Sequence, residues 1–287
     1  MFSFINLGNT CFFNSALQCL LAIRMFREII VNMSHCTNYY TFFMKALMTQ
    51  TVHQSLNVSD LYSHYLTDFK LQRNHPEDTS ECLSHLIDQL SDSRDTFARR
   101  SDVTSACQCH DFWQRTSTSW IDDMFTGLFG ITKRYECCRH VTQHFETFRS
   151  LVFYTDQVNG IMSCLMSYLK EETIDGVQCE RCEQRTRVCT YNTFHRLPPV
   201  LIFDLINTGN TLQTIEQTIH IEHRHGMPVK YVYDLKCIVL YVSQCHYKCI
   251  VFNDNIVYNI DDTRIEIIPD LATMNLQETR LLIYERG

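Results

Sequence analysis

Cys11 is the first residue whose position in the sequence suggests chemistry. It follows two residues of helix-capping type, Asn9 and Thr10, so it is predicted to lie in the first turn of a helix. The unpaired N–H groups and partial positive charge of a helix N-terminus favour the thiolate, which is the nucleophilic form of cysteine. Asn6 and Asn14 are near enough to donate hydrogen bonds to an oxyanion. The alternative is that Cys11 only packs in a core.

A cysteine nucleophile needs a base, and the base needs a group that orients it. The segment that begins at His246 is typical of a strand, and Asn253 and Asp254 are typical of a tight turn. A two-residue turn there places Asp261 opposite His246, where a histidine–carboxylate hydrogen bond can form, whereas a three-residue turn places Asp262 there. The alternative is that His246, one of 13 histidines, has no catalytic role and that the two aspartates form a surface turn.

A separate set of residues has the spacing of a metal site. Cys179 and Cys182 form a C-x-x-C pair, and Cys137 and His140 form a C-x-x-H pair upstream. Two such pairs brought together by strands would make a closed tetrahedral Cys₃His site for Zn²⁺, and Cys138 could substitute for Cys137. The alternative is that both pairs are reduced and metal-free. A second cluster, Cys107, Cys109 and His110, has no distant partner pair and is interpreted as loop sequence.

The hydrophobic pattern changes along the chain. Helical periodicity predicts helices over residues 11–30, 39–51, 56–71 and 80–90, and the polar residues 91–105 predict an exposed loop. From about residue 120, β-branched and aromatic residues predict strands over 145–154, 185–193, 200–206, 213–221, 233–242, 247–252, 256–260 and 280–284, with one helix over 160–170. Helices first and strands later predict an α+β fold.

Composition excludes several classes of protein. The chain has 287 residues, 45% of them hydrophobic, and a net charge of −7. These values predict a globular protein and argue against a nucleic-acid binder, which needs positive charge. No apolar run reaches the roughly 18 residues of a membrane span, and the N-terminus does not read as a signal peptide. Fifteen cysteines, an odd number, favour a reducing compartment, so a cytoplasmic or nuclear location is predicted.

Residues 6–18, NLGNTCFFNSALQ, strongly resemble the cysteine box of the ubiquitin-specific proteases, which are papain-like deubiquitinases. Other segments resemble further motifs of that family, in the family's order: 77–83 (EDTSECL), 194–201 (FHRLPPVL), 233–235 (YDL), 245–247 (CHY), 258–262 (YNIDD) and 281–285 (LLIYE). The resemblance covers nearly the whole chain, and only the polar loop near residue 100 has no counterpart.

The resemblance implies roles for individual residues. Cys11 becomes the nucleophile, Asn6 part of the oxyanion hole, His246 the base, and Asp261 rather than Asp262 the residue that orients it.

The resemblance also implies a substrate and a substrate contact. Asp78 and Glu81 fall on acidic positions that contact the tail of ubiquitin, which carries arginines. The expected substrates are ubiquitin and ubiquitinated proteins, cleaved after ubiquitin's C-terminal glycine, and the chain is expected to be a monomer that binds neither nucleic acid nor membrane.

The fold implied by the resemblance is a single papain-like cysteine protease domain over 1–287. It has a helical thumb (1–119), zinc-ribbon-like fingers (120–195) and a β-rich palm (196–287). Family members often hold a structural zinc ion with two C-x-x-C pairs at the finger tips, and Cys137, His140, Cys179 and Cys182 occupy the corresponding positions.

Four departures from the family pattern are visible. Cys245 replaces the glycine before the histidine, and only Ser243 and Gln244 remain of a longer loop. Val257 lies near the place of a usual tryptophan, and the basic-aromatic end of one palm strand is missing. One alternative is therefore a catalytically impaired protein that binds ubiquitin without cleaving it. A zinc-ribbon nucleic-acid module is a third hypothesis, which leaves both ends of the chain unexplained.

Overall fold

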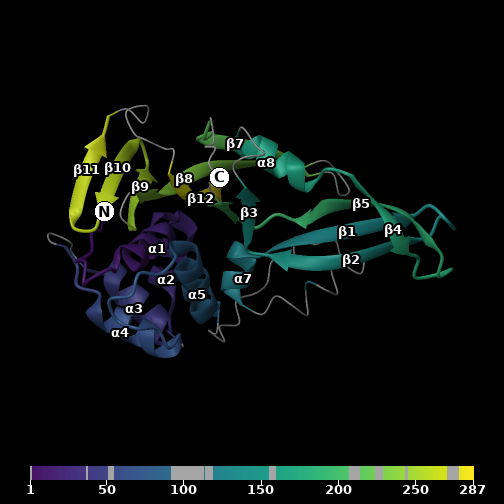
Figure 1. Cartoon of the computed structure of the whole chain (residues 1–287). Helices are drawn as coiled ribbons and strands as arrows, with labels where there is room; N and C mark the ends of the chain where they lie inside the picture. The colour runs from purple at the N-terminus through teal and green to yellow at the C-terminus, as the bar shows by residue number, and fades with distance from the viewer. Residues whose placement is uncertain are drawn as a thin grey trace.

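The computed structural model describes residues 2–36, 38–50, 55–91, 113, 119–154, 160–206, 214–223, 229–242, 245–269 and 278–287. Most of the predicted loop over 91–105 and the cluster at 107–110 lie outside these ranges. In Figure 1 most of the helices gather below a large sheet, and a smaller sheet extends away from them. None of the helices in the described ranges combines the length and the apolar character needed to cross a membrane.

The helices confirm the helical pattern of the first ninety residues, with one break. The predicted helix over 11–30 is interrupted at Ile23, whose backbone is extended with ψ 116°, so two helices form there. Helix α8 confirms the single helix expected among the strands. The helices are α1 (Cys11–Ala22), α2 (Arg24–Asn32), α3 (Tyr39–Met48), α4 (Ser59–Asp68), α5 (Thr79–Ser91), α7 (Trp120–Phe125) and α8 (Ile161–Tyr168).

Strands form two sheets. The large sheet has the order β11-β10-β9-β8-β12-β6-β3, with β7 also paired to β8, and only the β3–β6 pair is parallel. The small sheet has the order β2-β1-β5-β4. The strands are β1 (Gly127–Tyr135), β2 (Val141–Phe148), β3 (Ser150–Tyr154), β4 (Glu172–Gln178), β5 (Arg185–Arg196), β6 (Val200–Ile206), β7 (Thr218–His223), β8 (Val229–Val242), β9 (His246–Asn253), β10 (Ile256–Asp261), β11 (Arg264–Ile268) and β12 (Thr279–Arg286).

Three strands were not predicted, and one segment predicted as a single strand forms two strands. β1, β4 and β11 were missed, and the segment over 145–154 divides at Arg149 into strands of different sheets. Glycine lowers strand propensity, which hid β1. Its Gly130 is required by packing, since a Cβ atom there would lie 2.3 Å from Nε2 of His195.

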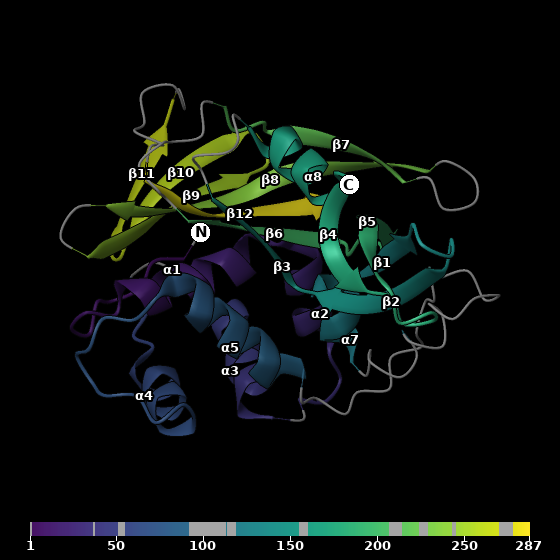
Figure 2. The same cartoon turned by 45° about the vertical axis from the view of Figure 1, so that its right-hand side comes forward.

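Helix α1 is the centre of the helical layer, which comprises α1 to α5. All twelve of its residues are buried, because it packs between α5 on one side and β8 and β9 on the other. Figure 2 shows α1 and α5 lying beneath the large sheet. Most of these residues are apolar, as such a position requires, and the buried polar side chains of Asn14 and Gln18 have hydrogen-bond partners. The burial of α1 fixes Cys11, at its N-terminus, against the strands that carry the other chemically interesting residues.

Glu285 fastens the other end of this layer to the large sheet. Its side chain projects from β12, is 3% exposed, and accepts hydrogen bonds from the backbone N–H groups of Arg24 (3.1 Å) and Met25 (2.7 Å) at the start of α2. The carboxylate therefore caps a helix from a different element, where its charge also complements the helix dipole.

Replacing Glu285 by alanine should lower the free energy of unfolding by about 1–3 kcal/mol, because two backbone donors at the start of α2 lose the charged acceptor that caps them. Glu28→Ala is the matched control, since Glu28 is 61% exposed and only approaches Arg24 at 4.0 Å. That control should change stability by less than about 0.5 kcal/mol. Urea unfolding followed by circular dichroism measures both, and equal losses would contradict the capping role.

Candidate active site

Cys11 begins α1, and the start of this helix has no side-chain cap. The hydroxyl of Thr10, the N-cap residue, instead turns back into the preceding loop. It accepts a hydrogen bond from the N–H of Leu7 (2.9 Å) and donates one to Oδ1 of Asn6 (3.3 Å). The first N–H groups of α1 thus remain without a side-chain acceptor beside the Cys11 thiol, an arrangement suited to a developing negative charge.

Asp262 holds this loop and helix in place from the far end of the sequence. One carboxylate oxygen accepts from Nδ2 of Asn6 (2.8 Å) and the other from Nδ2 of Asn14 (2.7 Å). The backbone carbonyl of Asp262 accepts from the N–H of Phe4 (3.0 Å). The sequence suggested Asp262 only as an alternative partner of His246, because no local pattern reveals a contact to residues about 250 positions away.

His246 and Asp261 form a close pair. Nε2 of His246 lies 2.6 Å from Oδ1 of Asp261, and the two side chains are 30% and 39% exposed. The sulfur of Cys11 lies 3.9 Å from the carbonyl oxygen of Cys245, the residue that directly precedes His246. Because Asp261 occupies Nε2, the other ring nitrogen, Nδ1, is the one left for exchanging a proton with a thiol. The Cys11 sulfur thus lies beside the backbone that leads into the His246–Asp261 pair.

The register of this hairpin differs from the prediction. The turn lies at Asp254 and Asn255, so Asn253 pairs with Ile256 and Cys249 pairs with Ile260. His246 and Asp261 are therefore diagonal neighbours and not directly opposed. A slip of two positions keeps the same side chains on the same face, and long side chains reach diagonal partners across a strand pair. The predicted contact forms although the predicted register is wrong.

Cys245 adopts a backbone conformation that normally favours glycine. Its φ is 59°, in the left-handed region that costs an ordinary residue roughly 1–2 kcal/mol. This explains why a glycine is expected before the histidine, and it shows that Cys245 keeps the glycine-like backbone. The Cys245 thiol is exposed and accepts a hydrogen bond from the hydroxyl of Tyr241 at 3.2 Å.

The environment of Cys11 favours the neutral thiol. Burial raises the pKa of Cys11, the backbone N–H of Tyr247 lowers it, and the negative charge of Asp262 raises it again, so that the pKa lies above its ordinary value. A thiol in this state requires a base to remove its proton during attack.

Asp78 and Glu81, the acidic residues of the segment over 77–83, lie at the start of α5. Asp78 precedes the first residue of this helix and accepts from the hydroxyl of Tyr247 (3.2 Å), the residue after His246. Glu81 lies in the first turn, and its side chain is 64% exposed. Asp78 therefore contacts the strand that begins with His246.

The metal candidate lies in the small sheet. The sulfurs of Cys137, Cys138, Cys179 and Cys182 all lie within 4.8 Å of one another, with Cys137 3.3 Å from Cys182 and Cys138 3.6 Å from Cys179. Four thiolates at about 2.3 Å from zinc would lie about 3.8 Å apart in a tetrahedron, so this donor set fits Zn²⁺.

His140 does not belong to this group, which corrects its predicted role. Its ring stacks on Tyr135 with centroids 5.8 Å apart, and its carbonyl accepts from the N–H of the same tyrosine. Cys138 takes its place, so the donor set is Cys₄ and not Cys₃His. The sequence could not choose among adjacent donors, because the choice depends on which side of a tight turn each one faces. Arg139, at the turn, has φ 54°.

One of the four thiols, that of Cys179, has a lowered pKa. Burial alone would raise the pKa of Cys179, but the N–H groups of Cys182 and Arg181 and the thiols of Cys138 and Cys137 lower it to about 7. A low-pKa thiol surrounded by donors is the usual first ligand of a metal cation.

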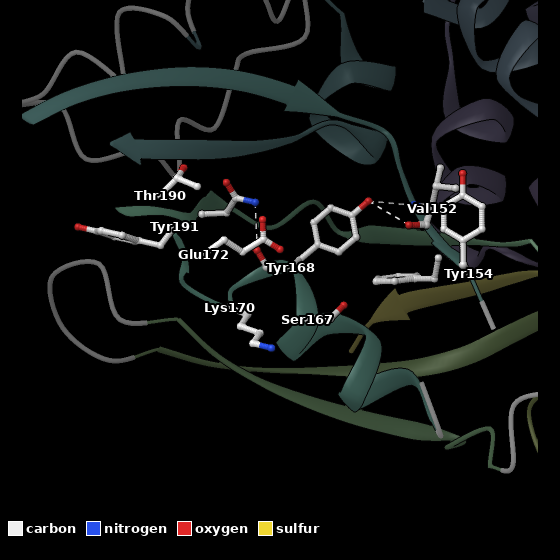
Figure 3. Close-up of a pocket in the computed structure, with 10 residues that line it drawn as sticks. Val152, Tyr154, Ser167, Tyr168, Lys170, Glu172, Thr190 and Tyr191 are labelled. Atoms are coloured by element: carbon white, nitrogen blue, oxygen red, sulfur yellow. Dashed lines mark hydrogen bonds between the residues drawn. The ribbon is translucent and has the colours of Figure 1, made fainter. Parts of the chain in front are cut away.

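A polar cavity of about 290 Å³ lies elsewhere, between the end of α8, β3, β4 and β5 (Figure 3). Tyr168 crosses it, and its hydroxyl bonds both the N–H (3.2 Å) and the carbonyl (3.1 Å) of Val152 on β3, the outer strand of the large sheet. No cysteine or histidine lines the cavity. Its tyrosine closes the exposed edge of a strand.

Replacing Cys179 by serine should remove zinc and loosen the tip of the small sheet. A tetrahedral site that loses one thiolate loses most of its affinity, and its binding energy contributes to folding. Elemental analysis of purified protein should give about one zinc per chain for the wild type and for the control Cys189→Ser, and less than about a tenth of that for Cys179→Ser. A metal-free wild type purified without chelators would contradict the site.

Replacing Asp262 by asparagine should lower the pH at which Cys11 becomes reactive. The substitution removes a negative charge that raises the pKa of Cys11, so the thiolate is populated at lower pH. The rate of alkylation by iodoacetamide, followed at Cys11 by mass spectrometry as a function of pH, measures this shift. Asp254→Asn, at the other end of the same hairpin, should leave the profile unchanged, and an upward shift for Asp262→Asn would contradict the argument.

Comparison with known proteins points to the family that the sequence motifs resemble. A model of the family described as ubiquitin carboxyl-terminal hydrolase matches residues 2–284. Ubiquitin carboxyl-terminal hydrolase 2 of Rattus norvegicus is 26% identical over 235 residues, which cover 70% of this chain but only 38% of that protein. Ubiquitin carboxyl-terminal hydrolase 12 of Salmo salar is 23% identical over 332 residues, which cover 99% of this chain and 89% of that protein.

Solved structures share the fold over the whole chain. A yeast SAGA DUB module with a mutant Sgf73 matches with a TM-score of 0.78 at 17% identity, covering 100% of this chain and 68% of that one. The SAGA DUB module of Ubp8, Sgf11, Sus1 and Sgf73 bound to monoubiquitin matches with a TM-score of 0.75, also at 17% identity, covering 100% of this chain and 69% of that one. With the Cys11, His246 and Asp261 arrangement in place, the match over residues 2–284 shows that this chain belongs to the ubiquitin carboxyl-terminal hydrolase family.

Proposed function

We propose that this protein is a thiol-dependent deubiquitinase that cleaves the isopeptide or peptide bond after the C-terminal glycine of ubiquitin. The observation that carries the proposal is that the Cys11 sulfur lies 3.9 Å from the carbonyl oxygen of Cys245, directly before His246, whose Nε2 lies 2.6 Å from Oδ1 of Asp261. The family match and the monoubiquitin-bound structural neighbour support ubiquitin as the ligand.

In the first step His246 acts as a general base. The raised pKa of Cys11 means that the thiol is protonated before substrate binds, so Nδ1 of His246 takes the proton as the sulfur attacks the carbonyl carbon of the terminal glycine. Asp261, bonded to Nε2, holds the ring in the tautomer that presents Nδ1 and stabilises the imidazolium that forms.

The oxyanion of the tetrahedral intermediate is stabilised at the start of α1. The backbone N–H of Cys11 is one donor. The second is the amide of Asn6, because only one of its two N–H bonds is needed for the contact to Asp262. Three donors to its oxygen, the N–H groups of Gly8 and Thr10 and the hydroxyl of Thr10, fix the orientation of this amide, which is the preorganisation that such a site needs.

Collapse of the intermediate expels the lysine amine. His246 donates its proton to the leaving nitrogen and leaves ubiquitin joined to Cys11 as a thioester. A water molecule, deprotonated by the same imidazole, then attacks the thioester and releases the ubiquitin carboxylate and the free thiol.

A structural zinc ion is part of the proposal. The Cys137, Cys138, Cys179 and Cys182 group would hold it at the turns that join β1 to β2 and β4 to β5. When bound, the ion supplies a cross-link between these turns and no chemistry at Cys11.

The remaining parts of the proposal concern organisation. We assign the thumb, fingers and palm to 1–119, 120–195 and 196–287, although β3 and α8, which fall in the second range, pack with the large sheet. The acidic start of α5, with Asp78 and Glu81, is proposed to face the basic ubiquitin tail. We also propose that the protein acts as a monomer in the cytoplasm or the nucleus.

A ubiquitin probe with a C-terminal propargyl group tests the function directly, because it labels only an activated cysteine next to the ubiquitin tail. The wild type should form a covalent adduct, and Cys11→Ala should form none while still binding ubiquitin. Binding without labelling of the wild type would establish the alternative, an inactive ubiquitin-binding protein. The absence of both would refute the proposal.

Asp261→Asn should lower kcat for a fluorogenic ubiquitin substrate by roughly 10²- to 10⁴-fold, because the amide does not fix the imidazole tautomer. Asp262→Asn should have the smaller effect, because the His246–Asp261 pair persists and the new side chain keeps one oxygen that can accept from Asn6 or Asn14. The reverse ranking would move the orienting role to Asp262.

A further inference from the structure

Two cysteines meet where β9 begins beside the start of α1. The Cys11 sulfur lies 3.9 Å from the carbonyl oxygen of Cys245, an oxygen two bonds away from the Cα atom of that residue. The backbone N–H of Tyr247, two residues further on, also bonds the Cys11 sulfur. The backbone on either side of His246 therefore holds Cys245 against the residue proposed as the nucleophile.

The side chain of Tyr241 lies close to both thiols. Its hydroxyl donates a hydrogen bond to the sulfur of Cys245 (3.2 Å), and its ring packs on that of Tyr247 with centroids 4.9 Å apart. A negative charge on Cys245 or on Cys11 raises the pKa of Tyr241, as expected when both sulfurs are near its hydroxyl. The Cys245 thiol thus shares its surroundings with Cys11.

Exposure separates the two sulfurs. Cys11 is 5% exposed, whereas Cys245 is one of two exposed cysteines in the ranges that the structure describes. The other is Cys137, which belongs to the metal candidate. Because susceptibility to oxidation follows exposure, an oxidant dissolved in water meets Cys245 before it meets Cys11.

The backbone conformation of Cys245 favours a movement of this residue. A disulfide needs Cα atoms about 4.4–6.8 Å apart, so its closure requires Cys245 to leave Tyr241 and approach Cys11. The left-handed φ of 59° costs about 1–2 kcal/mol, and leaving this conformation releases that cost. A glycine at this position would supply neither the thiol nor the strain.

We propose that Cys245 is a resolving cysteine, which forms a reversible disulfide with Cys11 when the protein meets a peroxide. The disulfide removes the nucleophile and so switches the site off, and a dithiol restores it. The inference goes beyond the proposed function, because the bond forms between two residues of this chain whatever substrate the chain cleaves.

The reaction takes two steps. The Cys245 sulfur attacks one oxygen of hydrogen peroxide, the O–O bond breaks, and the thiol becomes a sulfenic acid while the second oxygen leaves as water. The Cys11 sulfur then attacks the sulfenic sulfur as Nδ1 of His246 takes the thiol proton. The S–O bond breaks, and the hydroxide leaves with that proton as water. Two thiols therefore lose two electrons, and one peroxide becomes two water molecules.

Peptide mapping after peroxide treatment tests the proposal. The full chain, purified without chelators, is treated with hydrogen peroxide, blocked with N-ethylmaleimide and digested without reductant. Trypsin leaves Cys11 with Cys19 in the peptide over 1–24, and Cys237 with Cys245 in the peptide over 237–248. Chymotrypsin cuts after Phe12 and Tyr241 and so separates the two members of each pair. A link between Cys11 and Cys245 is expected.

Cys19 and Cys237 are the internal control. Their sulfurs lie 3.9 Å apart, but both residues are 0% exposed, so no link is expected between them. If these two are linked as readily as Cys11 and Cys245, exposure does not select the pair and the proposal is overturned.

Cys245→Gly is the decisive variant, since glycine suits a φ of 59°. The wild type should lose its labelling by the propargyl ubiquitin probe at least roughly tenfold after peroxide treatment and regain it with dithiothreitol. The variant should label normally before treatment. Once peroxide has carried its Cys11 past the sulfenic acid, dithiothreitol should not restore labelling. Cys189→Ser, which removes a partly exposed thiol of β5, should behave as the wild type.

Two results would overturn the inference. One is equal recovery of Cys245→Gly and the wild type, and the other is inactivated wild type that carries no link between Cys11 and Cys245. A wild type that never labels, even before peroxide, would instead refute the proposed function, and peptide mapping would still decide whether the two thiols join.

Discussion

The carboxylate of Asp262 is the interaction on which the site depends. It joins the loop before α1, through Asn6, and the first turns of α1, through Asn14, to the end of the hairpin that carries His246 and Asp261. Without it, the elements that carry Cys11 and His246 would be held together mainly by apolar packing and by the backbone hydrogen bond from Phe4 to Asp262. Two charge-assisted hydrogen bonds of 2.7 and 2.8 Å define the distance more sharply. The same carboxylate charge raises the pKa of the Cys11 thiol. Asp262 therefore positions the groups of the site and also makes attack by Cys11 depend on a base.

Much of this architecture is visible in the sequence, for identifiable reasons. The helices over 39–48, 59–68 and 79–91 repeat apolar residues with helical spacing, and the strands at 200–206 and 279–286 are runs of β-branched and aromatic residues, so local pattern and final environment agree. The break at Ile23 and the glycine-containing strand over 127–135 were missed, because tertiary packing decides both. The chemistry-bearing residues were predicted from resemblance and type; the His246–Asp261 pair forms, and the Cys11 sulfur lies against the carbonyl of Cys245.

Residue spacing alone does not choose between neighbouring residues, and for Asp261 and Asp262 only the family resemblance favoured one of them. Asp261 and Asp262 are adjacent, and the structure assigns one to His246 and the other to Asn6 and Asn14. Among the residues at 137–140, Cys138 and not His140 faces the pair at Cys179 and Cys182. In both places one peptide unit reverses the direction of a side chain near a residue with positive φ, at Asp262 and at Arg139. Spacing alone carries no information about that reversal.

The distance along the chain between the two halves of the site has a consequence during synthesis. Residues 2–14 leave the ribosome long before residues 245–262, and the contacts of Cys11, Asn6, Asn14 and Phe4 with Cys245 and Asp262 join these two segments. A nascent or prematurely terminated polypeptide therefore displays the thiol without imidazole or carboxylates beside it. The proposed peptidase site therefore cannot form until the segment over 245–262 has been synthesised and has packed against residues 2–14.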